Sequence, residues 1–514
     1  MTQKYFGVMT VNVTGVELLI VNLKTHKSLE KVTKEINLGD DVYRQHPVRF
    51  ESVNKIVEAL TGFIQILHDY GVENYQLWGS QALSQALNAD FMADQFFLHT
   101  GIEIRWLSMS DEVYYRNQNV SLELEQENHI VYLVGITSGN TSVTRYDSGK
   151  FVTSTNFALG PIKIAEDLQS LRQSAPNSIS VLNDYIDSKL KDFDIGSLVN
   201  VTIKEDSQII LLGTSPIKNV VTHYIKEELE PAFSISVFND LVDDIVDASD
   251  QYLTDQLQVN EDAVPLILPE LLLIRRIIQL TGAKQISFSD SGIIDGIVND
   301  EEVALGFSKH DFTKQMTTMA INLANHYDVE PVHRELVTKF ALHLFNQLKP
   351  LHTLGKRERV LLEIASILHD VGNYIGVHSH YLHSEYIIKN SDIIGLSSEE
   401  LEIIAAIAKY HSATTPSEDL SHFSQISAEN RRLISKLAAI LRLADALDDD
   451  RQQKIQKISV SIKSQSVVIS AYSNANLAYE NWIFNSKSQF FQETYGLKAV
   501  LKQRGGLSNG KNKL

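Results

Sequence analysis

Residues 129–152 read HIVYLVGITSGNTSVTRYDSGKFV, with apolar residues alternating on both sides of a polar turn at 138–140. Alternation with a period of two is typical of a half-buried strand, and Gly139 can adopt the unusual backbone angles of a tight turn. A second polar turn follows at 148–149. This stretch therefore predicts a β-hairpin that opens a structural unit in the middle of the chain.

The chain itself opens with the same pattern. Apolar residues at 6, 8, 11 and 13 precede a polar turn at Thr14–Gly15, and an apolar run then starts at Val16. Both hairpins lead into βα units, with a helix expected at 52–71 and short strands expected at 75–77, 102–107, 208–212 and 285–288. Two halves of this kind predict two similar α/β lobes that face a cleft. An unrelated pair of α/β domains is the alternative.

The pattern changes to nearly continuous helix from about residue 312. Apolar stripes with a period of 3.6 run through segments that begin at 333, 357, 384, 398 and 430. After Arg451, strand alternation returns at 455–462 and 467–469, and a helix at 487–495 and a last strand follow. We therefore expect lobes at 1–125 and 126–309, a helical domain at 310–452, a small α/β domain at 453–502 and a disordered tail at 503–514.

Composition excludes several classes of function. The chain has 514 residues and a formal net charge of −18, which argues against a generic binder of nucleic acid or of an anionic membrane. Cys is absent, so disulfides, thiolate metal sites and Cys nucleophiles are excluded. The amino terminus lacks the apolar run of a signal peptide, and no segment approaches the roughly 18 apolar residues of a membrane span. We expect a soluble, cytoplasmic, multidomain protein.

The helical segment carries the strongest chemical signal. His369–Asp370 ends an apolar helix pattern, His333 opens an earlier helix, and Asp445 lies in a later one. Imidazole and carboxylate groups together suit Zn, Mn, Fe or Mg. An ion held in this way can polarise a phosphoryl oxygen and generate hydroxide at neutral pH. We predict that these four residues bind one divalent metal ion.

Further polar residues lie between these positions. His383 and His411 are available for a second ion, whereas His378 and His380 are interpreted as solvated loop residues. The acidic run at 448–450 is interpreted as an exposed helix end. The full spacing on successive helices is the pattern of the HD-domain metal-dependent phosphohydrolases.

Seven segments are informative when taken together: LLGTSPIKNVV, SFSDSGIIDGIVND, VHRELVTKFALHLFNQL, LLEIASILHDVG, HYLHSEYIIKNSDIIGLS, IAAIAKYH and LRLADALD. Through them the sequence resembles the exopolyphosphatase/guanosine pentaphosphate phosphohydrolase (Ppx/GppA) family over nearly its whole length. The resemblance implies actin-like lobes of the acetate/sugar kinase–Hsp70–actin superfamily, an HD-like all-α domain and a small α/β carboxy-terminal domain. It also implies release of terminal phosphate from polyphosphate or pppGpp, usually with Mg²⁺, by a homodimer.

The two hairpins depart from the family pattern where the family keeps its phosphate chemistry. Thr10 stands where the first hairpin has an acidic residue, and Gly135 and Ser142 replace acidic residues of the second. Ser84 replaces the phosphate-binding Arg, while Glu112 aligns with the carboxylate that activates the attacking water. Loss of these charges removes much of the positioning and neutralisation on which phosphoryl transfer depends.

Backbone N–H groups at the turns could still cradle an anion. The resulting candidate phosphate-binding residues are Gly15, Gly139, Asn140, Thr141 and Gly213.

Three hypotheses follow. The first is an exopolyphosphatase-type hydrolase with Glu112 as general base. In the second, the lobes are a binding or scaffold module and the HD domain, with Asp370, is the phosphohydrolase. The third is a non-catalytic regulator that binds polyphosphate or an alarmone. We expect a phosphoanhydride hydrolase in which the HD residues are the more intact site, with Mg or Mn as cofactor and Zn or Fe as further candidates. Its partner would be polyphosphate or a phosphorylated guanine nucleotide.

Overall fold

The computed structural model divides into two compact units, residues 1–315 and residues 316–514. It describes residues 4–38, 41–42, 46–124, 127–137, 139–165, 178–190, 207–213, 216–225, 232–412, 414–416, 419 and 423–505. The turn residues Ser138 and Thr214, and the end of the chain from 506 onward, lie outside this part.

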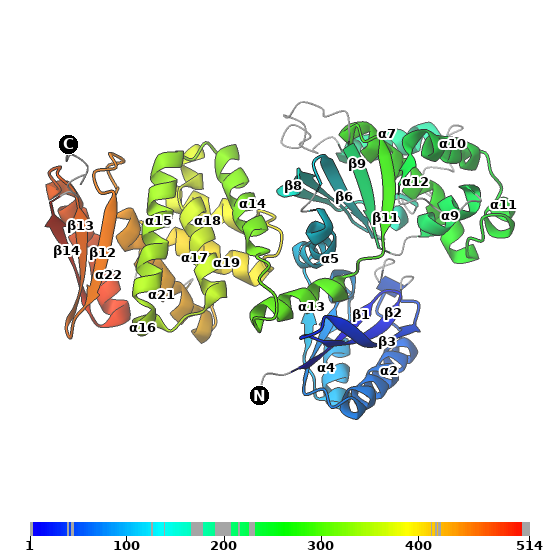
Figure 1. Ribbon diagram of the computed structural model, residues 1–514, viewed down its shortest axis with the longest axis horizontal. Coiled ribbons are helices and arrows are strands. Elements are labelled where there is room, and N and C mark those ends of the chain that lie inside the picture. The colour runs from blue at the N-terminus through cyan, green and yellow to red at the C-terminus, as the bar shows by residue number, and fades with distance from the viewer. Residues whose placement is uncertain are drawn as a thin grey trace, which may run out of the picture. The chain divides into compact units, whose positions relative to one another are not determined.

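The first unit contains two mixed sheets that repeat one another's order (Figure 1). One sheet has the order β3-β2-β1-β4-β5, and the other has the order β10-β11-β9-β6-β7-β8. In each sheet, the first three strands in sequence order pair antiparallel with one another. The first of them, β1 or β6, also pairs with a later strand that runs parallel to it, β4 or β9. The strands of the first sheet are β1 (Tyr5–Asn12), β2 (Gly15–Asn22), β3 (Lys27–Glu35), β4 (Asn74–Gly79) and β5 (Ile104–Trp106). Those of the second are β6 (Ile130–Ile136), β7 (Thr141–Asp147), β8 (Lys150–Phe157), β9 (Ser207–Leu212), β10 (Phe233–Ser234) and β11 (Gln285–Ser289).

This repeated topology confirms the predicted pair of similar α/β lobes. Both hairpins form as predicted, with Asn12 opposite Gly15 in the first and Ile136 opposite Thr141 in the second. The turns lie beside the ends of β4 and β9, because these strands run parallel to β1 and β6. The polar turns of each lobe therefore share one edge of their sheet with the loop that follows the next parallel strand.

Apolar helices cover the sheets. In the first lobe, α2 (Phe50–Asp69) buries its apolar stripe against the sheet, and α13 (Ile293–Ala304) packs on the opposite face. In the second lobe, α12 (Val264–Thr281) is buried along most of its length. The remaining helices are α3 (Gln81–Ser84), α4 (Ala89–Thr100), α5 (Met109–Glu123), α7 (Ser178–Leu190), α9 (Pro216–Ile225), α10 (Ile235–Val246), α11 (Asp250–Asp255) and the 3₁₀ helix η2 (Glu261–Ala263).

The second unit is helical and ends in a small sheet. The helix α14 (Thr313–His326) carries the chain into this unit. Within it, the packed helices are α15 (Pro331–Gln347), α16 (Lys349–His352), α17 (Lys356–Leu368), the 3₁₀ helix η3 (Val371–Tyr374), α18 (His380–Lys389), α19 (Ser398–Lys409) and α21 (Ala428–Asp445). The strands β12 (Lys457–Ile462), β13 (Ser466–Tyr472) and β14 (Lys498–Arg504) form the sheet, in that order.

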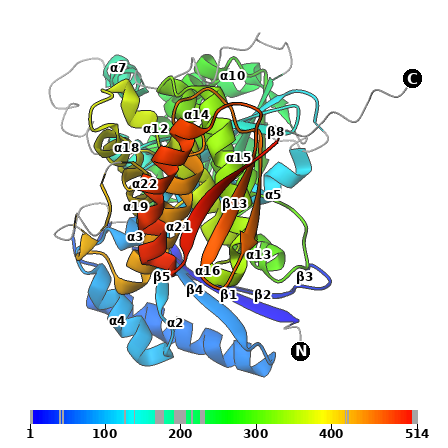
Figure 2. The same cartoon turned by 90° about the vertical axis from the view of Figure 1, so that its left-hand side faces the viewer.

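The helix α22 (Ala478–Tyr495) connects β13 to β14 and packs against both α21 and β14, as Figure 2 shows. It is twice as long as the helix expected at 487–495. The last strand extends to Arg504, into the segment expected as a tail. None of the described helices is both long and apolar enough to cross a bilayer.

Candidate metal centre

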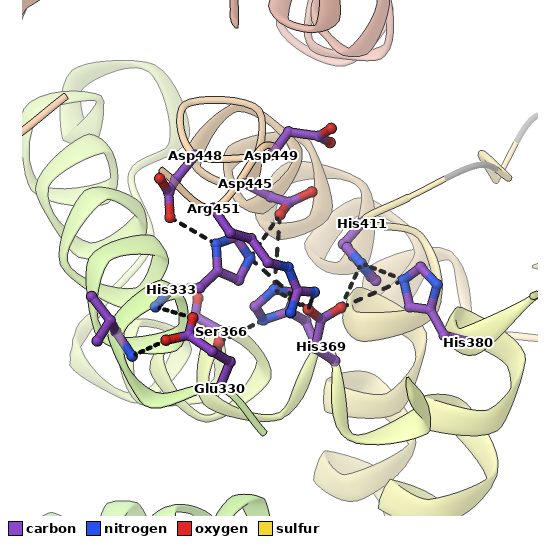
Figure 3. A network of polar contacts seen from close by, with 12 residues as sticks. Glu330, His333, Ser366, His369, His380, His411, Asp445, Asp448, Asp449 and Arg451 are labelled. Atoms are coloured by element: carbon purple, nitrogen blue, oxygen red, sulfur yellow. Dashed lines mark hydrogen bonds and ion pairs between the residues drawn. The ribbon is translucent and has the colours of Figure 1, made fainter. Parts of the chain in front are cut away.

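Six residues of the second unit meet where its helices begin or end (Figure 3). His333 lies in the first turn of α15, where Glu330 accepts hydrogen bonds from the amides of Val332 and His333 and fixes the start of the helix. Helix ends place side chains at the boundary of the apolar core, so polar groups from several helices can gather there. The histidine–aspartate cluster comprises His333, His369, Asp370, His380, His411 and Asp445.

The Nε2 atoms of the four histidines point toward the two carboxylates. His333 Nε2 lies 3.5 Å from Asp445 Oδ1 and 3.9 Å from Asp370 Oδ2. His369 Nε2 lies 3.8 Å from the same two oxygen atoms. On the other side of Asp370, Oδ1 lies 3.5 Å from His380 Nε2 and 3.7 Å from His411 Nε2. Asp370 therefore faces one pair of imidazoles with each of its oxygens.

The Nδ1 atoms of the same rings point outward to oxygen acceptors. His369 Nδ1 lies 2.8 Å from the carbonyl of Ser366, and His411 Nδ1 lies 2.5 Å from that of Ala408. His380 Nδ1 faces the carbonyl of Val377 at 3.2 Å. A carbonyl oxygen can only accept, so each Nδ1 carries the proton, and Nε2 of the neutral ring is then a bare acceptor.

His333 follows the same rule through a side chain. Its Nδ1 lies 2.9 Å from Oδ2 of Asp448, and both residues are almost fully buried. A carboxylate that orients a metal-binding imidazole in this way fixes the tautomer and raises the basicity of the ring. All four rings thus present the same nitrogen to the centre of the cluster.

The inward nitrogens lack protein donors. Within the described part of the chain, His369 Nε2 is buried with no hydrogen-bond partner. The Nε2 atoms of His380 and His411 face each other at 3.2 Å, so two neutral rings would oppose their lone pairs there. His352, another buried histidine of this unit, contrasts with them because both of its ring nitrogens are hydrogen bonded. Buried polar groups are normally paired, and a cation is what would pair these.

The spacing of the donors fits metal ions. An ion about 2.1 Å from its nitrogen and oxygen ligands holds neighbouring ligand atoms roughly 3–3.5 Å apart. The measured separations of 3.5–3.9 Å need only a small contraction. One group of donors comes from His333, His369 and Asp370, with Asp445 beside it, and a second comes from Asp370, His380 and His411. No Cys is available, so the ligands are nitrogen and oxygen only.

For most of the cluster, the pKa shifts favour the protonation states that bind metal, which are neutral histidines and ionised carboxylates. Burial lowers the pKa of His411 to about 3 and also lowers the pKa of His369, so both rings are neutral near pH 7. Burial raises the pKa of Asp445, but Lys487 and His333 outweigh it and hold that pKa well below its ordinary value. Burial lowers the pKa of His333, but Asp445 and Asp448 outweigh it and raise the pKa to about 9.

Two cations border the carboxylates. Lys487 of α22 pairs with Oδ2 of Asp445 and lies 2.9 Å from Asp449. Arg451, which follows α21, places Nη2 2.5 Å from Oδ2 of Asp370. The sequence analysis gave no site role to these two residues, and it interpreted Asp448 as part of an exposed helix end. The signal available for Asp448 was its position three residues after Asp445, on the same face of a helix end.

The structure brings together four of the predicted ligands and His411, but it places His380 rather than His383 in the cluster. The interpretation of His380 as a solvated loop residue was wrong, because α18 begins at His380 and points its ring at His411. His383 is half-buried on the next turn and makes no hydrogen bond or ion pair within the described residues. The interpretation of Asp448 as exposed was also wrong, since it is 1% exposed.

The first hairpin of the other unit already supplies its own acceptor. The side-chain oxygen of Asn12 accepts hydrogen bonds from the amides of Thr14 at 2.8 Å and Gly15 at 3.0 Å. Gly15 has φ +148°, and a Cβ there would lie 2.2 Å from the carbonyl of Lys34. Glycine is therefore needed at this turn for close backbone packing, and its amide is not free for a phosphate.

Three of the other candidate phosphate-binding residues also have protein contacts. The Thr141 hydroxyl is buried and donates to the carbonyl of Leu159 at 2.7 Å. The amide of Gly213 donates to the carbonyl of Ser289 at 3.0 Å. The Asn140 side chain lies 3.5 Å from that of Gln81. Gly139 forms the bend between β6 and β7.

Glu112 lies in the first turn of α5 and is 9% exposed. Its Oε1 accepts a hydrogen bond of 2.8 Å from the amide of Gln81, at the start of α3, and its Oε2 lies 3.8 Å from Arg116. The carboxylate therefore satisfies an amide at a helix start. We define the hairpin region as the β1–β2 and β6–β7 turns together with Glu112 and Gly213.

Comparison with known proteins gives the family. The profile described as "Ppx/GppA phosphatase family" matches residues 19–304, and "Ppx/GppA phosphatase, domain III" matches residues 316–492. The chain belongs to the Ppx/GppA phosphatase family. The expected family resemblance is thus confirmed.

Individual relatives and solved structures are also similar to this chain. The chain is 23% identical over 435 residues to the guanosine-5'-triphosphate,3'-diphosphate pyrophosphatase of Aeromonas hydrophila, covering 81% of this chain and 82% of that protein. It is 31% identical over 138 residues to the Aeromonas salmonicida protein of the same name, over 27% of each chain. An exopolyphosphatase structure from Cytophaga hutchinsonii is similar with a TM-score of 0.49 and 14% identity, over 59% of this chain and all of that one.

Proposed function

We propose that this protein is a metal-dependent hydrolase that releases terminal phosphate from polyphosphate or pppGpp at the histidine–aspartate cluster. Membership of the Ppx/GppA phosphatase family gives the reaction class, hydrolysis of a phosphoanhydride. One observation carries the assignment to this site: four imidazoles turn their Nε2 atoms toward two carboxylates, and His369 Nε2 has no hydrogen-bond partner within the described residues.

The chain's own residues would hold two divalent ions. His333, His369 and Asp445 would bind the first, His380 and His411 would bind the second, and Asp370 would contribute one oxygen to each. Four imidazole ligands favour Mn, Fe or Zn over Mg, which prefers oxygen donors. A bound ion supplies charge neutralisation at a phosphoryl oxygen and an activated water. Asp448 and the carbonyls of Ser366 and Ala408 would hold the imidazoles in the orientation that this requires.

The contacts of the hairpin region support a different role for it. The amides of Thr14 and Gly15 already have an acceptor, and Glu112 is bound to Gln81 and Arg116. Lys218, a cation close to this region in the sequence, is paired with Asp290 at 2.7 Å. We therefore propose that the first unit binds or supports rather than hydrolyses.

The substrate class rests on the family and on the relatives. The named Aeromonas relatives are pyrophosphatases of a guanosine pentaphosphate, and the similar Cytophaga structure is an exopolyphosphatase. Both substrates present terminal phosphates, and a net charge of −18 means that local cations must offset repulsion. A homodimer, which the resemblance implies, stays part of the proposal.

Metal analysis of the full-length protein tests the site. Purified without chelator, the wild-type chain should contain about two equivalents of divalent metal, or take up Mn²⁺ to that level. Asp370→Asn should lose both ions, because Asp370 faces both groups of ligands, and should lose phosphate release by at least about 100-fold. Removal of a residue that hydrogen bonds to a metal ligand usually costs about 10–100-fold in metal affinity or activity. Removal of a ligand that two ions share should cost more.

A matched pair of histidine variants sharpens the result. His380→Ala should reduce uptake to one equivalent, whereas His378→Ala, two residues earlier and exposed, should bind like the wild type. A wild-type protein that contains no metal and takes up no Mn²⁺, Fe²⁺ or Zn²⁺ would exclude the proposed site. If His380→Ala and His378→Ala take up the same amount of metal, the proposed second ion site is excluded.

A further inference from the structure

Arg451 occupies the carboxylate oxygen that the first ion would need. Its Nη2 lies 2.5 Å from Oδ2 of Asp370, the same atom that lies 3.9 Å from His333 Nε2 and 3.8 Å from His369 Nε2. Figure 3 shows Arg451 extending over His369 from the end of α21. A divalent ion among these three donors and the guanidinium therefore compete for one oxygen, and their positive charges repel each other.

Lys487, the other cation of the site, is placed differently. It pairs with Oδ2 of Asp445, whereas Oδ1 of Asp445 faces His333 and His369. Its side chain is 13% exposed and is also held by Asp449. Lys487 thus pairs with the outer oxygen of its carboxylate and can stay in place when an ion binds, whereas Arg451 pairs with the inner oxygen.

The backbone of Arg451 is fixed but its side chain is accessible. Its amide donates to the carbonyl of Asp448 at 2.9 Å, and its own carbonyl accepts from the Gln453 side chain at 2.6 Å. The residue has φ +56°, in the left-handed region that side chains other than glycine rarely adopt. In contrast, the side chain is 44% exposed. A displaced guanidinium could therefore turn toward solvent while it remains anchored beside the cluster.

We propose that Arg451 is a phosphate-binding residue of this site, released from Asp370 when the divalent ion binds. This inference rests on the proposed function. A guanidinium offers a rigid fork of N–H donors that matches two phosphate oxygens, and such charge-assisted pairs are strong. Before the ion binds, Asp370 holds the guanidinium. The metal ion must therefore bind first, and the anionic substrate binds second.

Two binding measurements on the full-length protein test this order. Arg451→Gln is compared with the wild type and with Arg432→Gln, which removes an exposed arginine of α21 in the same unit. Calorimetry first measures Mn²⁺ binding to chelator-treated protein, and then inorganic phosphate binding to the Mn²⁺-loaded protein. We expect Arg451→Gln to bind Mn²⁺ about tenfold more tightly and phosphate at least about tenfold more weakly, in line with a charged hydrogen bond lost in each state. Arg432→Gln should match the wild type in both.

Arg451→Lys serves as a second variant. It keeps the charge that competes for Asp370 but loses the fork, so its Mn²⁺ affinity should stay near that of the wild type while its phosphate affinity falls. Unchanged phosphate binding by Mn²⁺-loaded Arg451→Gln would overturn the proposal, as would unchanged Mn²⁺ affinity. If the wild-type protein takes up no Mn²⁺, the proposed function is contradicted, and this inference is contradicted with it.

Discussion

The hairpin region and the histidine–aspartate cluster both gather polar groups at the ends of secondary-structure elements, but they satisfy those groups differently. In the hairpin region, Asn12 accepts from the turn amides, and Glu112 accepts from Gln81. In the cluster, His369 Nε2 is buried without a partner within the described residues, and His380 and His411 face each other through bare nitrogens.

The difference separates turn amides and a carboxylate that already have protein partners from a buried imidazole nitrogen that a cation would pair. An unpaired buried polar group costs about 1–3 kcal/mol, so a ligand that pairs His369 Nε2 would stabilise the cluster. The family assignment covers both units and does not choose between them. The hydrogen bonds of the individual side chains support the proposal that the cluster is the reactive site, and the predictions on Asp448 and Glu112 test it.

Among residues that are not themselves metal ligands, the largest effect should come from the one that orients His333. Asp448→Asn replaces a buried carboxylate that accepts from His333 Nδ1. We expect metal affinity and phosphate release to fall by about 10–100-fold, the usual range for an outer partner of a metal ligand. Asp450→Asn, two residues further on, provides the control because Asp450 pairs with Lys454 instead.

Metal titration of both variants in the same buffer checks this prediction. If Asp448→Asn and Asp450→Asn bind Mn²⁺ equally, the carboxylate beside His333 is not a support for a metal ligand, and the contrast between the two regions weakens.

A smaller effect should come from an ion pair that joins α18, which carries His380, to α19, which ends two residues before His411. Lys409 lies in the last turn of α19, 9% exposed, and pairs with Glu385 of α18 at 3.0 Å and with Asp419 at 2.9 Å. Lys409→Met should lower stability by roughly 1–3 kcal/mol, between the values for exposed and buried pairs. Lys389→Met is the matched control, since Lys389 pairs with the same Glu385 from within α18 and is more exposed.

The pH dependence of the Lys409→Met penalty tests whether the ion pair with Glu385 is its cause. Burial raises the pKa of Glu385, but hydrogen bonds from Lys409 and Lys389 outweigh it and hold the pKa below its ordinary 4.5. A carboxyl group with a lowered pKa contributes stability that is full above its ordinary pKa and is lost as pH falls. The penalty of Lys409→Met, measured as a shift in thermal melting, should therefore shrink below pH 4.5. A penalty that stays constant at low pH would show that packing, not the ion pair, is lost.

Much of the fold could be predicted because its signals are local. The hairpins at 5–22 and 130–147 follow from alternation and from Gly15 and Gly139 at the turns. The helix α22 was predicted only from residue 487, because its first half mixes aromatic and polar residues without a clear stripe. The buried face of that half, including Glu480 and Phe484, is defined by the elements that it meets rather than by its own period.

The site could be predicted less completely, since spacing along a chain does not show which way a helix faces. His380 and His383 are three residues apart, and only the start of α18 at His380 decides that His380 meets His411. Asp448 looks like part of an exposed acidic run until its burial against His333 is known. Arg451 carries no motif, and its role depends on a backbone turn that brings it back to Asp370.

The smallest effect should come from Glu112, and it decides between the two regions. Glu112→Gln keeps an oxygen that can accept from the Gln81 amide, and it loses only the charge beside Arg116. We expect phosphate release to change by less than about threefold, compared with a loss of at least about 100-fold for Asp370→Asn. A general base in an organised site contributes about 10²–10⁴-fold, so the two outcomes are well separated. Phosphate release from polyphosphate and from pppGpp, measured on both variants with metal content recorded, makes the test. Abolished hydrolysis in Glu112→Gln together with intact hydrolysis in Asp370→Asn would place the reaction in the hairpin region and reverse the comparison.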